Sequence, residues 1–409
     1  MKFDLSFTGA PVTAFLDFYK WTMLQAMAHQ LNHSGGVTLR YRHTVRTKNA
    51  GTARVKEALR EALDAFEDRH VLLPDELGHA RAIRFLKPVY VNDTLRDLRL
   101  HPKDMVRIGE KDGEVTVEVE GGIASSLLET LVLATVSELM TQLSFPTEAG
   151  RRAASDRGLD FLAGEIKKLK IAVAASPGKI FRLTEAGTRR RFTLAHHRRV
   201  MELIRNEMPG QLFGTSNIHF AFGMDLRPVG TQAHEFGMLF QQHGGTLKTF
   251  VSRSLQAWVE EYRGDLGYAL PDVLTTKAFL ESFDLYFAKL FDGVRHDSGD
   301  PHEWTRLVVS HFGKLGIDPA SKFAVYSDGL DFAAALDLWR RYEGNPWKTS
   351  YLIGTFLSNN IPGHKALSQV MKLVAVNGQP VAKISDEPEK AVCDSPEFLA
   401  ALKQTFGIV

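Results

Sequence analysis

The sequence contains almost no cysteine and has no strong bias in charge. Cys393 is the one cysteine among 409 residues, which excludes an intramolecular disulfide framework and a zinc site built on cysteines. Lysine and arginine total 50 against 48 acidic residues, so the net charge is +2. This balance gives no general argument for a nucleic-acid or membrane partner. Any preference for anions must come from local clusters.

Long apolar runs and common nucleotide-binding motifs are also missing. We find no apolar run of the roughly 18 residues that a membrane-spanning helix needs. Residues 1–10 carry Lys2 and Asp4 and contain no apolar stretch of signal-peptide length. Neither a Walker A motif nor a Gly-x-Gly-x-x-Gly motif is found. We therefore expect a cytoplasmic protein that binds neither membrane nor nucleic acid.

The two ends of the chain have the patterns of antiparallel β structure. Residues 37–45 alternate, which predicts a strand with Val37, Leu39, Tyr41 and His43 on one face. Residues 105–120 and 370–384 each predict a hairpin, because Asp-Gly and Asn-Gly pairs stand between alternating apolar residues. Helices are expected over residues 11–31, 53–70 and 123–143.

The middle of the chain differs, since short apolar runs alternate with helical stretches from about residue 170 to 360. Strands are expected at 171–175, 293–297, 323–328 and 350–355, with helices such as 302–315 and 329–342. This alternation predicts βαβ units. The expected fold class is α/β: an irregular, TIM-like α/β barrel over residues 126–365, with a mixed β-rich domain from residues 1–125 and 366–409. In such barrels the function lies where strands end.

A run of three arginines forms the first candidate site. Gly187 and Thr188 precede Arg189, Arg190 and Arg191. Guanidinium groups make forked, charge-assisted bonds to phosphate, and a helix start would add backbone N–H groups. The run predicts a phosphate or pyrophosphate site, and a solvated basic helix start is the alternative.

A second cluster, RHDSGDP, occupies residues 295–301, directly after an apolar run. It places Arg295, Asp297 and Ser298 close together in sequence. Asp297 could bind ribose hydroxyls or hold Mg²⁺. The alternative is a turn in which an acidic residue or serine caps the helix that begins at Pro301.

Two glycine-containing loops follow the next predicted strands. Asp328 lies in the first, Ser327-Asp328-Gly329, and the second contains Gly354 and Thr355. Glycine lets the backbone approach a ligand closely, and such loops after late barrel strands suit a terminal phosphate. Each could equally be an ordinary turn between a strand and a helix. Four strand ends with anion-binding chemistry favour one shared site.

His234 stands in the segment GTQAHE, residues 230–235. A lone histidine is more often structural than catalytic, and the adjacent Glu235 need not share its face. Spacing alone therefore gives His234 no role.

These segments together resemble the nicotinate phosphoribosyltransferase family. The resemblance covers about residues 11–405, and the segments GTRRRF, GTQAHE and RHDSGDP are highly specific in combination. The matching segments are LDFYK (16–20), GTRRRF (187–192), FGTSN (213–217), PVGTQAHE (228–235), LGYALPDVLTT (266–276), GVRHDSGDP (293–301), SDGLD (327–331), IGT (353–355) and KLVAVNGQPVAKISD (372–386).

The resemblance implies a type II phosphoribosyltransferase fold and a defined reaction. Nicotinate and 5-phosphoribosyl-1-pyrophosphate give nicotinate mononucleotide and pyrophosphate, the first step of NAD salvage from nicotinate. ATP is a co-substrate and Mg²⁺ a cofactor. The histidine phosphorylated by ATP corresponds to His234. The resemblance also implies a homodimer with active sites shared between subunits.

Roles for individual residues follow from this resemblance as expectations. Arg189, with Arg42, would stabilise the departing pyrophosphate, and Asp297 would hold the ribose hydroxyls or the metal. Tyr19 would stack on the pyridine ring from the partner subunit. The remaining expected substrate-binding residues are Thr188, Ser216, Arg295, Ser298, Asp328, Gly354 and Thr355.

Two positions bear on the choice of substrate. Ser216 stands where nicotinamide-using relatives carry an aspartate, so a hydroxyl donor there, with Arg295, favours an acid over an amide. Ser216 capping a helix is the alternative. Ala186 stands where family members commonly have phenylalanine, and losing that ring would weaken binding by roughly 0.5–1.5 kcal/mol.

Competing functions remain open at this point. A related enzyme could use nicotinamide or another pyridine on the same fold. Quinolinate as substrate would require more basic residues than we can place. A non-catalytic phosphosugar-binding homologue is disfavoured by the intact motifs. A nucleic-acid binder is disfavoured by the charge balance.

Overall fold

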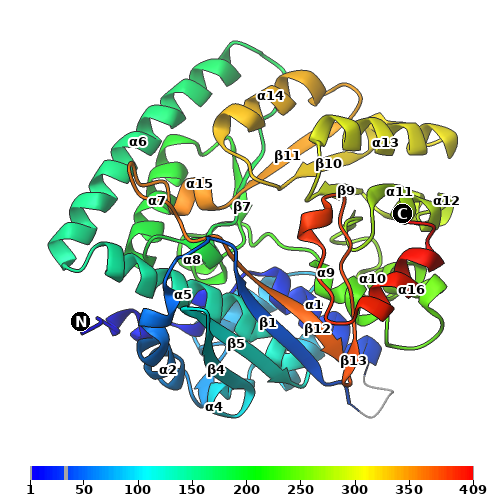
Figure 1. Ribbon diagram of the computed structural model, residues 1–409. Coiled ribbons are helices and arrows are strands. Elements are labelled where there is room, and N and C mark those ends of the chain that lie inside the picture. Colours follow the sequence, from blue (N-terminus) through cyan, green and yellow to red (C-terminus); the bar gives the residue numbers. More distant parts are fainter. Residues whose placement is uncertain (1, 32–35, 409) are drawn as a thin grey trace.

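Two β-sheets organise the structure, a computed structural model that describes residues 2–31 and 36–408 (Figure 1). The antiparallel sheet has the order β13-β12-β1-β5-β4, and the parallel sheet has the order β7-β6-β11-β10-β9-β8. The strands of the first are β1 (Leu39–Val45), β4 (Val106–Lys111), β5 (Glu114–Gly121), β12 (Gln369–Val376) and β13 (Gln379–Pro380). Those of the second are β6 (Leu183–Glu185), β7 (Leu212–Thr215), β8 (Tyr268–Ala269), β9 (Gly293–His296), β10 (Phe323–Tyr326) and β11 (Lys348–Ile353).

Helices surround these sheets, and a small pair of strands, β2 (Arg69–His70) and β3 (Arg99–Leu100), lies apart from them. The helices are α1 (Tyr19–Leu31), α2 (Lys56–Asp64), α3 (Leu77–Ala82), α4 (Pro102–Met105), α5 (Leu128–Ser144), α6 (Glu148–Ala174), α7 (Leu194–Glu207), α8 (Ile218–Gly223), α9 (His234–Leu239), α10 (Phe250–Tyr262), α11 (Thr276–Ser282), α12 (Leu285–Leu290), α13 (Pro301–Lys314), α14 (Phe332–Tyr342), α15 (Thr355–Ser358) and α16 (Pro396–Thr405). In Figure 1, α6, α13 and α14 lie on the side of the parallel sheet away from the antiparallel sheet.

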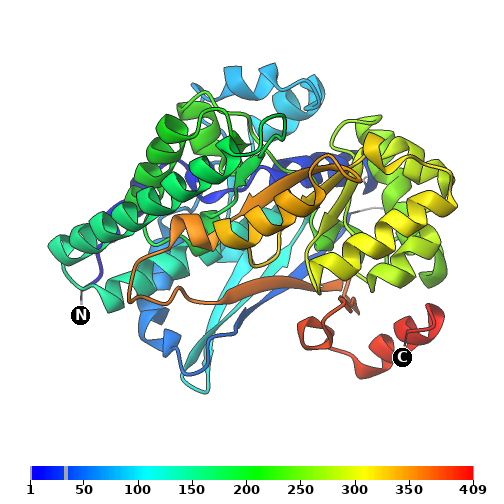
Figure 2. The same cartoon turned by 90° about the horizontal axis from the view of Figure 1, so that it is seen from above.

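The antiparallel sheet brings the two chain ends together, because β1 pairs with β12 on one side and β5 on the other. Both views show the C-terminal strand beside the N-terminal one (Figures 1 and 2). The predicted face of β1 is confirmed, since Val37, Leu39, Tyr41 and His43 are all buried. Both hairpins form, and their turn residues adopt positive φ. The return strand β13 is short, and beyond Pro380 the backbone N–H of Val381 still donates to the carbonyl oxygen of Val374 at 3.1 Å.

The parallel sheet confirms the predicted α/β class. β10 pairs in parallel with β9 and β11, and β11 in turn pairs with β6. With the antiparallel sheet, this gives the expected combination of an α/β region and a β-rich region. The strands of the two sheets fall on either side of residues 125 and 366, although those domain boundaries stay a prediction.

Three segments differ from the prediction. Residues 171–175 were predicted to be a buried strand, but they end helix α6, and Ile171 is 64% exposed. A short apolar run alone cannot distinguish a strand from a helix end. The helix expected over residues 11–31 begins only at Tyr19, after a 3-10 turn and an extended Leu16. The helical segment expected over residues 53–70 contains α2, which ends at Asp64.

One helical stretch, Ile123–Ser144 with 22 residues, is long and apolar enough to cross a membrane by length and composition alone, although polar residues interrupt it. In the structure 83% of its most apolar window is buried inside the protein. The helix also carries Glu129 and Glu138, both of which are ion-paired inside the core. This is the environment of a core helix.

Candidate active site

A cavity of about 630 Å³ lies where the parallel strands end and faces the antiparallel sheet. The loops after β6, β9, β10 and β11 contribute to its wall, and strand β12 contributes Lys372 from the other sheet. The carboxyl ends of parallel strands meet at one edge, which is where α/β folds bind ligands. Of the predicted site residues, the cavity gathers Tyr19, Arg189, Ser216, His234, Arg295, Asp297, Asp328, Gly354 and Thr355.

Arg189 enters the cavity from the short turn after β6 and is held by two carboxylates. Its Nε lies 3.7 Å from Asp17 Oδ2, and its Nη1 lies 3.7 Å from Glu129 Oε1. The guanidinium carbon is 6.0 Å from the centre of the Tyr19 ring. Because two edges of the guanidinium face acidic groups, its third nitrogen, Nη2, is the one best placed for a ligand.

The three consecutive arginines have different surroundings. Arg190 lines the cavity and donates to the carbonyl oxygen of Gln369. Arg191 is fully buried in the core, where its Nε donates to Glu138 at 3.0 Å. Only two members of the run are therefore available to an anion in the cavity.

Ser216 lies at the pyridine end of the predicted site, but its hydroxyl has a partner. Its Oγ donates to Asp17 Oδ1 at 2.7 Å. Burial raises the pKa of Asp17, an effect that Arg189 opposes. A direct bond from Ser216 to a carboxylate substrate would require this hydroxyl to leave Asp17, and it stays a prediction. The helix-cap alternative is not met, because Asn217 supplies the side chain that caps α8.

Arg295, Asp297 and Ser327 form one hydrogen-bonded group after strands β9 and β10. Ser327 Oγ donates to Asp297 Oδ1 at 2.7 Å, and Arg295 Nη2 lies 3.3 Å from the same oxygen. Burial opposes ionisation of Asp297, but Arg295 and neighbouring donors lower its pKa to about 2. Asp297 is therefore a carboxylate at neutral pH, as ribose or metal binding requires.

The loops after β10 and β11 lie next to this group. The Asp328 carboxylate forms an ion pair with Lys390, whose Nζ lies 2.9 Å from Oδ2, so the negative charge of Asp328 is already compensated. Gly354 is required by close packing of the protein itself, because a Cβ there would lie 2.7 Å from the carbonyl oxygen of Ala186. Thr355 begins the short helix α15 at the edge of the cavity.

His234 begins helix α9, and its Nε2 hydrogen-bonds to Asp272 Oδ1. Asp272 Oδ2 in turn accepts from Lys383 at 2.8 Å. Although Asp272 opposes it, burial lowers the pKa of His234 to about 4, so the imidazole is neutral at pH 7. With Nε2–H donating to Asp272, Nδ1 keeps its lone pair, and we find no hydrogen bond to it among the described residues.

Three predicted residues lie outside the cavity wall. Arg42 faces away, where it pairs with Glu118 at 2.9 Å and with Asp394 at 2.6 Å. Thr188 is fully buried and accepts from Asn217 Nδ2 at 3.1 Å, behind the arginine turn. Ser298 is buried beside Asp386. The geometry therefore does not support their predicted contacts with substrate. Residues that follow one another in the sequence point to different sides of the backbone, so the neighbour of a cavity residue can point into the core.

Tyr19 lines the cavity of its own chain. Its stacking on the pyridine ring from the partner subunit stays a prediction. Ala186 lines the cavity where the resemblance predicts a phenylalanine. Phe213 also lines it, with the Arg227 guanidinium carbon 4.4 Å from its ring centre.

Several residues of the site were missed by sequence reasoning. Asp17, Glu129, Asp272, Lys372 and Lys383 face the cavity or its charged groups. Burial lowers the pKa of Lys372 to about 8. Asp17 and the two lysines lie inside segments matched by the resemblance, so those segments held a signal. Glu129 lies on a mostly apolar helix, α5, where Glu129 and Glu138 are the two charged residues and only the charge itself marked it.

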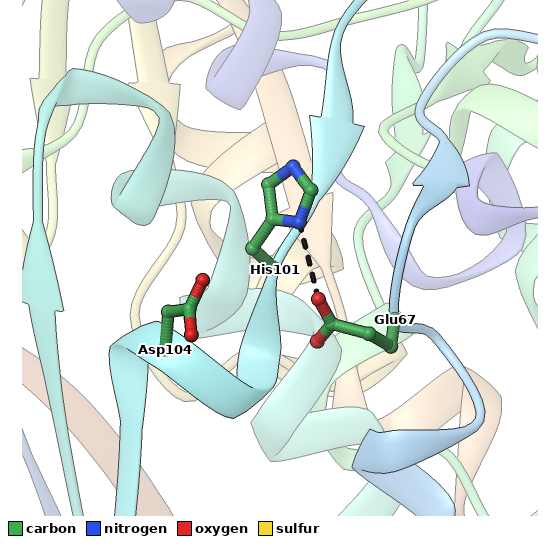
Figure 3. A group of neighbouring side chains, drawn as sticks. All are labelled: Glu67, His101 and Asp104. Carbon is green, nitrogen blue, oxygen red and sulfur yellow. Dashed lines mark hydrogen bonds and ion pairs between the residues drawn. The ribbon is translucent and has the colours of Figure 1, made fainter.

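A second cluster of similar residue types lies elsewhere, formed by Glu67, His101 and Asp104 (Figure 3). His101 Nδ1 is 3.1 Å from Glu67 Oε1, and Glu67 Oε2 accepts from the backbone N–H of Lys103. Figure 3 shows Asp104 to one side of that bond. Asp104 is exposed and the His101 side chain is 41% exposed. These contacts fasten the start of α4 and give no indication of a ligand.

Comparison with known families places this geometry in context. Residues 181–409 match the nicotinate phosphoribosyltransferase (NAPRTase) family, and residues 15–137 match the N-terminal domain of the same family. A nicotinate phosphoribosyltransferase of Neisseria gonorrhoeae is 40% identical over 401 residues, covering 96% of each chain.

Solved structures agree with the sequence comparison. A crystal structure of nicotinate phosphoribosyltransferase from Vibrio cholerae has a TM-score of 0.90 at 34% identity, covering 98% of this chain and 94% of the other. The corresponding enzyme of Porphyromonas gingivalis has a TM-score of 0.83 at 27% identity, covering 98% and 100%. The similarity therefore extends over both sheets and the cavity between them.

Proposed function

This chain belongs to the nicotinate phosphoribosyltransferase family, and we propose that nicotinate and 5-phosphoribosyl-1-pyrophosphate react in the cavity that contains Arg189, Asp297 and His234. The activity is the transfer of a phosphoribosyl group to nicotinate, which leads into NAD salvage. The observation that carries the assignment of the site is the meeting of four strand-end loops with buried charges of both signs in one cavity.

The bond changes define what the cavity must stabilise. The pyridine nitrogen forms a bond to ribose C1 while the bond from C1 to the pyrophosphate oxygen breaks. Negative charge develops on the pyrophosphate and positive charge on the sugar. Preorganised cations aimed at developing charge are worth more in a buried site than in water. Arg189 and Lys372 supply such cations from opposite sheets.

We assign the ribose and its 5′-phosphate to the loops after β9, β10 and β11. Asp297 is ionised and accepts hydroxyl hydrogens, while Thr355 and the loop at Asp328 border the same region. Asp297 is also the best candidate ligand for Mg²⁺. The ion prefers oxygen donors and commonly combines one or two carboxylates with substrate phosphates. Both oxygens of Asp272 are already occupied by His234 and Lys383.

The pyridine ring is assigned to the end of the cavity near Tyr19 and Ser216. Arg295 provides the positive charge that a carboxylate substrate requires. Because Ser216 donates to Asp17, Arg295 carries the preference for nicotinate over nicotinamide. An enzyme that accepts nicotinamide or another pyridine stays the second candidate, favoured by the engagement of that hydroxyl.

His234 is assigned as the group that ATP phosphorylates. Nδ1 attacks the γ-phosphorus, the bond to the β–γ bridging oxygen breaks, and ADP leaves. Water later cleaves the P–N bond, which releases phosphate and restores the imidazole. A neutral imidazole oriented by a carboxylate is the form suited to this attack. Lys372 and Lys383 lower the pKa of His234 further and provide cations for the phosphates of ATP.

We also propose a cytoplasmic location, consistent with a single half-buried thiol, Cys393. Dimerisation remains a proposal from the resemblance. The site is lined by Tyr19 of the same chain, so subunit contact would add to a cavity that one chain already forms.

The test is a turnover assay with nicotinate, phosphoribosyl pyrophosphate, Mg²⁺ and ATP, beside the variant His234→Ala. Nicotinate mononucleotide should form, ATP should stimulate its formation, and the variant should lose the stimulation. Product from nicotinamide but none from nicotinate would overturn the substrate assignment and leave the assignment of the fold unchanged. Stimulation by ATP that persists in His234→Ala would overturn the assignment of His234.

A further inference from the structure

Lys20, the last residue of the LDFYK segment, is completely buried and contacts two carboxylates. Its Nζ lies 2.6 Å from Glu129 Oε2 on α5 and 2.7 Å from Glu235 Oε1 on α9. Burying a lysine is costly unless its ammonium group is paired, and even a paired buried ion adds little to stability compared with apolar packing. Stability alone therefore gives no reason for an ion cluster at this place.

The cluster joins two parts of the active site that are far apart in sequence. On one side, Glu129 Oε1 lies 3.7 Å from Arg189 Nη1, the arginine assigned to pyrophosphate. On the other side, Glu235 follows His234 in the first turn of α9. A continuous series of charges thus runs from Arg189, which is partly exposed to the cavity, through the buried Glu129, Lys20 and Glu235 to the start of the helix that carries His234.

We propose that Lys20, with Glu129 and Glu235, forms a coupling element: it transmits the phosphorylation state of His234 to the pyrophosphate-binding guanidinium of Arg189. All three are positioning residues, because they act through Arg189 and His234. This inference rests on the proposed function, in which ATP phosphorylates His234.

The direction of the effect follows from charge. A phosphoryl group adds about −1.5 to −2 charge at pH 7, and on His234 it is carried by the residue that directly precedes Glu235 in the first turn of α9. Burial raises the pKa of Glu235 to about 7, which Lys20 opposes and Glu129 reinforces. The other groups that interact with Glu235 are Lys372 on β12, Tyr41 on β1 and Tyr19 on α1. The charge on Glu235 is therefore easily changed by a new anion nearby.

Phosphorylation then alters how Lys20 divides its contacts. The phosphate favours the neutral form of Glu235. The ammonium group of Lys20 then loses its ion pair with Glu235 and pairs more strongly with Glu129. A better-paired Glu129 attracts Arg189 less, which frees the guanidinium for the pyrophosphate of the substrate. Linkage requires the converse as well, so pyrophosphate bound at Arg189 should favour the phosphorylated enzyme.

The test compares wild-type enzyme with Glu235→Gln, a neutral side chain of the same shape. For each, KM for phosphoribosyl pyrophosphate is measured with and without ATP, together with ADP formed per nicotinate mononucleotide and labelled phosphate on His234. In the wild type, ATP should lower KM by about 5–150-fold, the usual range of coupling between sites. In Glu235→Gln the label should still enter His234, the ratio of KM values should approach one, and ADP per product should rise.

Glu138→Gln is the matched control. Glu138 is a buried, ion-paired glutamate on the same helix as Glu129, but its partner is Arg191 in the core. Its removal should lower thermal stability and leave the KM ratio unchanged. Glu129→Gln removes the charge next to Arg189 and serves as a second variant if Glu235→Gln does not fold. In this variant too, the ratio of KM values without and with ATP should approach one.

The outcomes separate the two proposals. A wild-type enzyme without labelled His234 would overturn the proposed function, and this inference with it. A labelled wild type whose KM ratio and stoichiometry persist in a folded Glu235→Gln or Glu129→Gln enzyme would overturn the coupling element alone. Equal loss of coupling in Glu138→Gln would also overturn it, because any buried ion pair would then have the same effect.

Discussion

Two clusters in this protein bring one histidine and two acidic residues close together, and their surroundings differ. His234, Asp272 and Asp297 lie at the cavity, where His234 and Asp272 are buried. Glu67, His101 and Asp104 lie at the start of α4 and are partly or fully exposed (Figure 3). The types of ligand atom are the same, and their mutual distances are similar.

The difference between the clusters is the environment of the histidine. At the cavity, burial lowers the pKa of His234, while Asp272 fixes which nitrogen carries the hydrogen. Lys383 and Lys372 add positive charge nearby. Among the described residues, the hydrogen-bond partner found for the His101 ring is Glu67, which also accepts from the backbone N–H group of Lys103. Catalytic character therefore comes from desolvation and from the neighbours of the cluster.

The largest expected effect is the loss of His234. His234→Ala should abolish incorporation of phosphate from ATP, because no other histidine is found among the described residues that line the cavity. His101→Ala is the matched control and should incorporate phosphate at the wild-type level. Retention of an acid-labile phosphate after trapping of His234→Ala with labelled ATP would break the distinction between the clusters.

The next effect concerns the carboxylate partner of each histidine. Asp272→Asn should lower the rate of His234 phosphorylation by roughly 10²–10⁴-fold, because an amide no longer fixes the tautomer that leaves Nδ1 free. Glu67→Gln should leave this rate unchanged. Rapid-quench measurement of phosphohistidine formation gives the rate for each variant. Similar rates in the wild type and Asp272→Asn would show that Asp272 does not orient His234.

A smaller effect is expected on stability as a function of pH. The pKa of His234 is about 4 in the folded protein, lowered by burial, against about 6.5 in an unfolded chain. Between these values the unfolded chain binds more protons, so the free energy of unfolding falls as the pH drops from 6.5 to 4. The contribution is on the order of 3 kcal/mol.

Urea titrations of the metal-free protein from pH 7 to pH 5 measure this slope. His234→Gln should have a shallower dependence than the wild type. Equal slopes in the two proteins would show that burial of His234 in the isolated chain is less complete than the structure indicates.

The smallest effect is expected from adding a metal ion to the exposed cluster. Because Glu67 already accepts two hydrogen bonds and Asp104 faces solvent, Zn²⁺ should raise the thermal midpoint by less than about 1 °C, equivalent to a few tenths of a kcal/mol. A larger rise that His101→Ala abolishes would make this a second metal site and weaken the comparison.

Sequence reasoning succeeded where a local pattern carried its own physical cause. The alternation over β1 fixed which face would be buried, and the Asn-Gly and Asp-Gly pairs fixed two hairpins. It failed for residues 171–175, because five apolar residues suit either a strand or a helix end. It also selected Thr188 and Ser298 as substrate-binding residues, although both side chains are buried outside the cavity wall. Adjacency in sequence to a cavity residue does not determine on which side of the backbone a side chain lies.

The sequence by itself determined the family, the alternation of strands and helices in the middle of the chain, and the motifs that supply Arg189, His234 and Asp297. Only the tertiary structure decided which of these side chains meet, because strands β6, β9, β10 and β11 are distant in sequence and adjacent only in the sheet. It also decided the chemistry of each group. The low pKa of His234 and the pairing of Lys20 with Glu129 and Glu235 arise from burial among residues far apart in the chain.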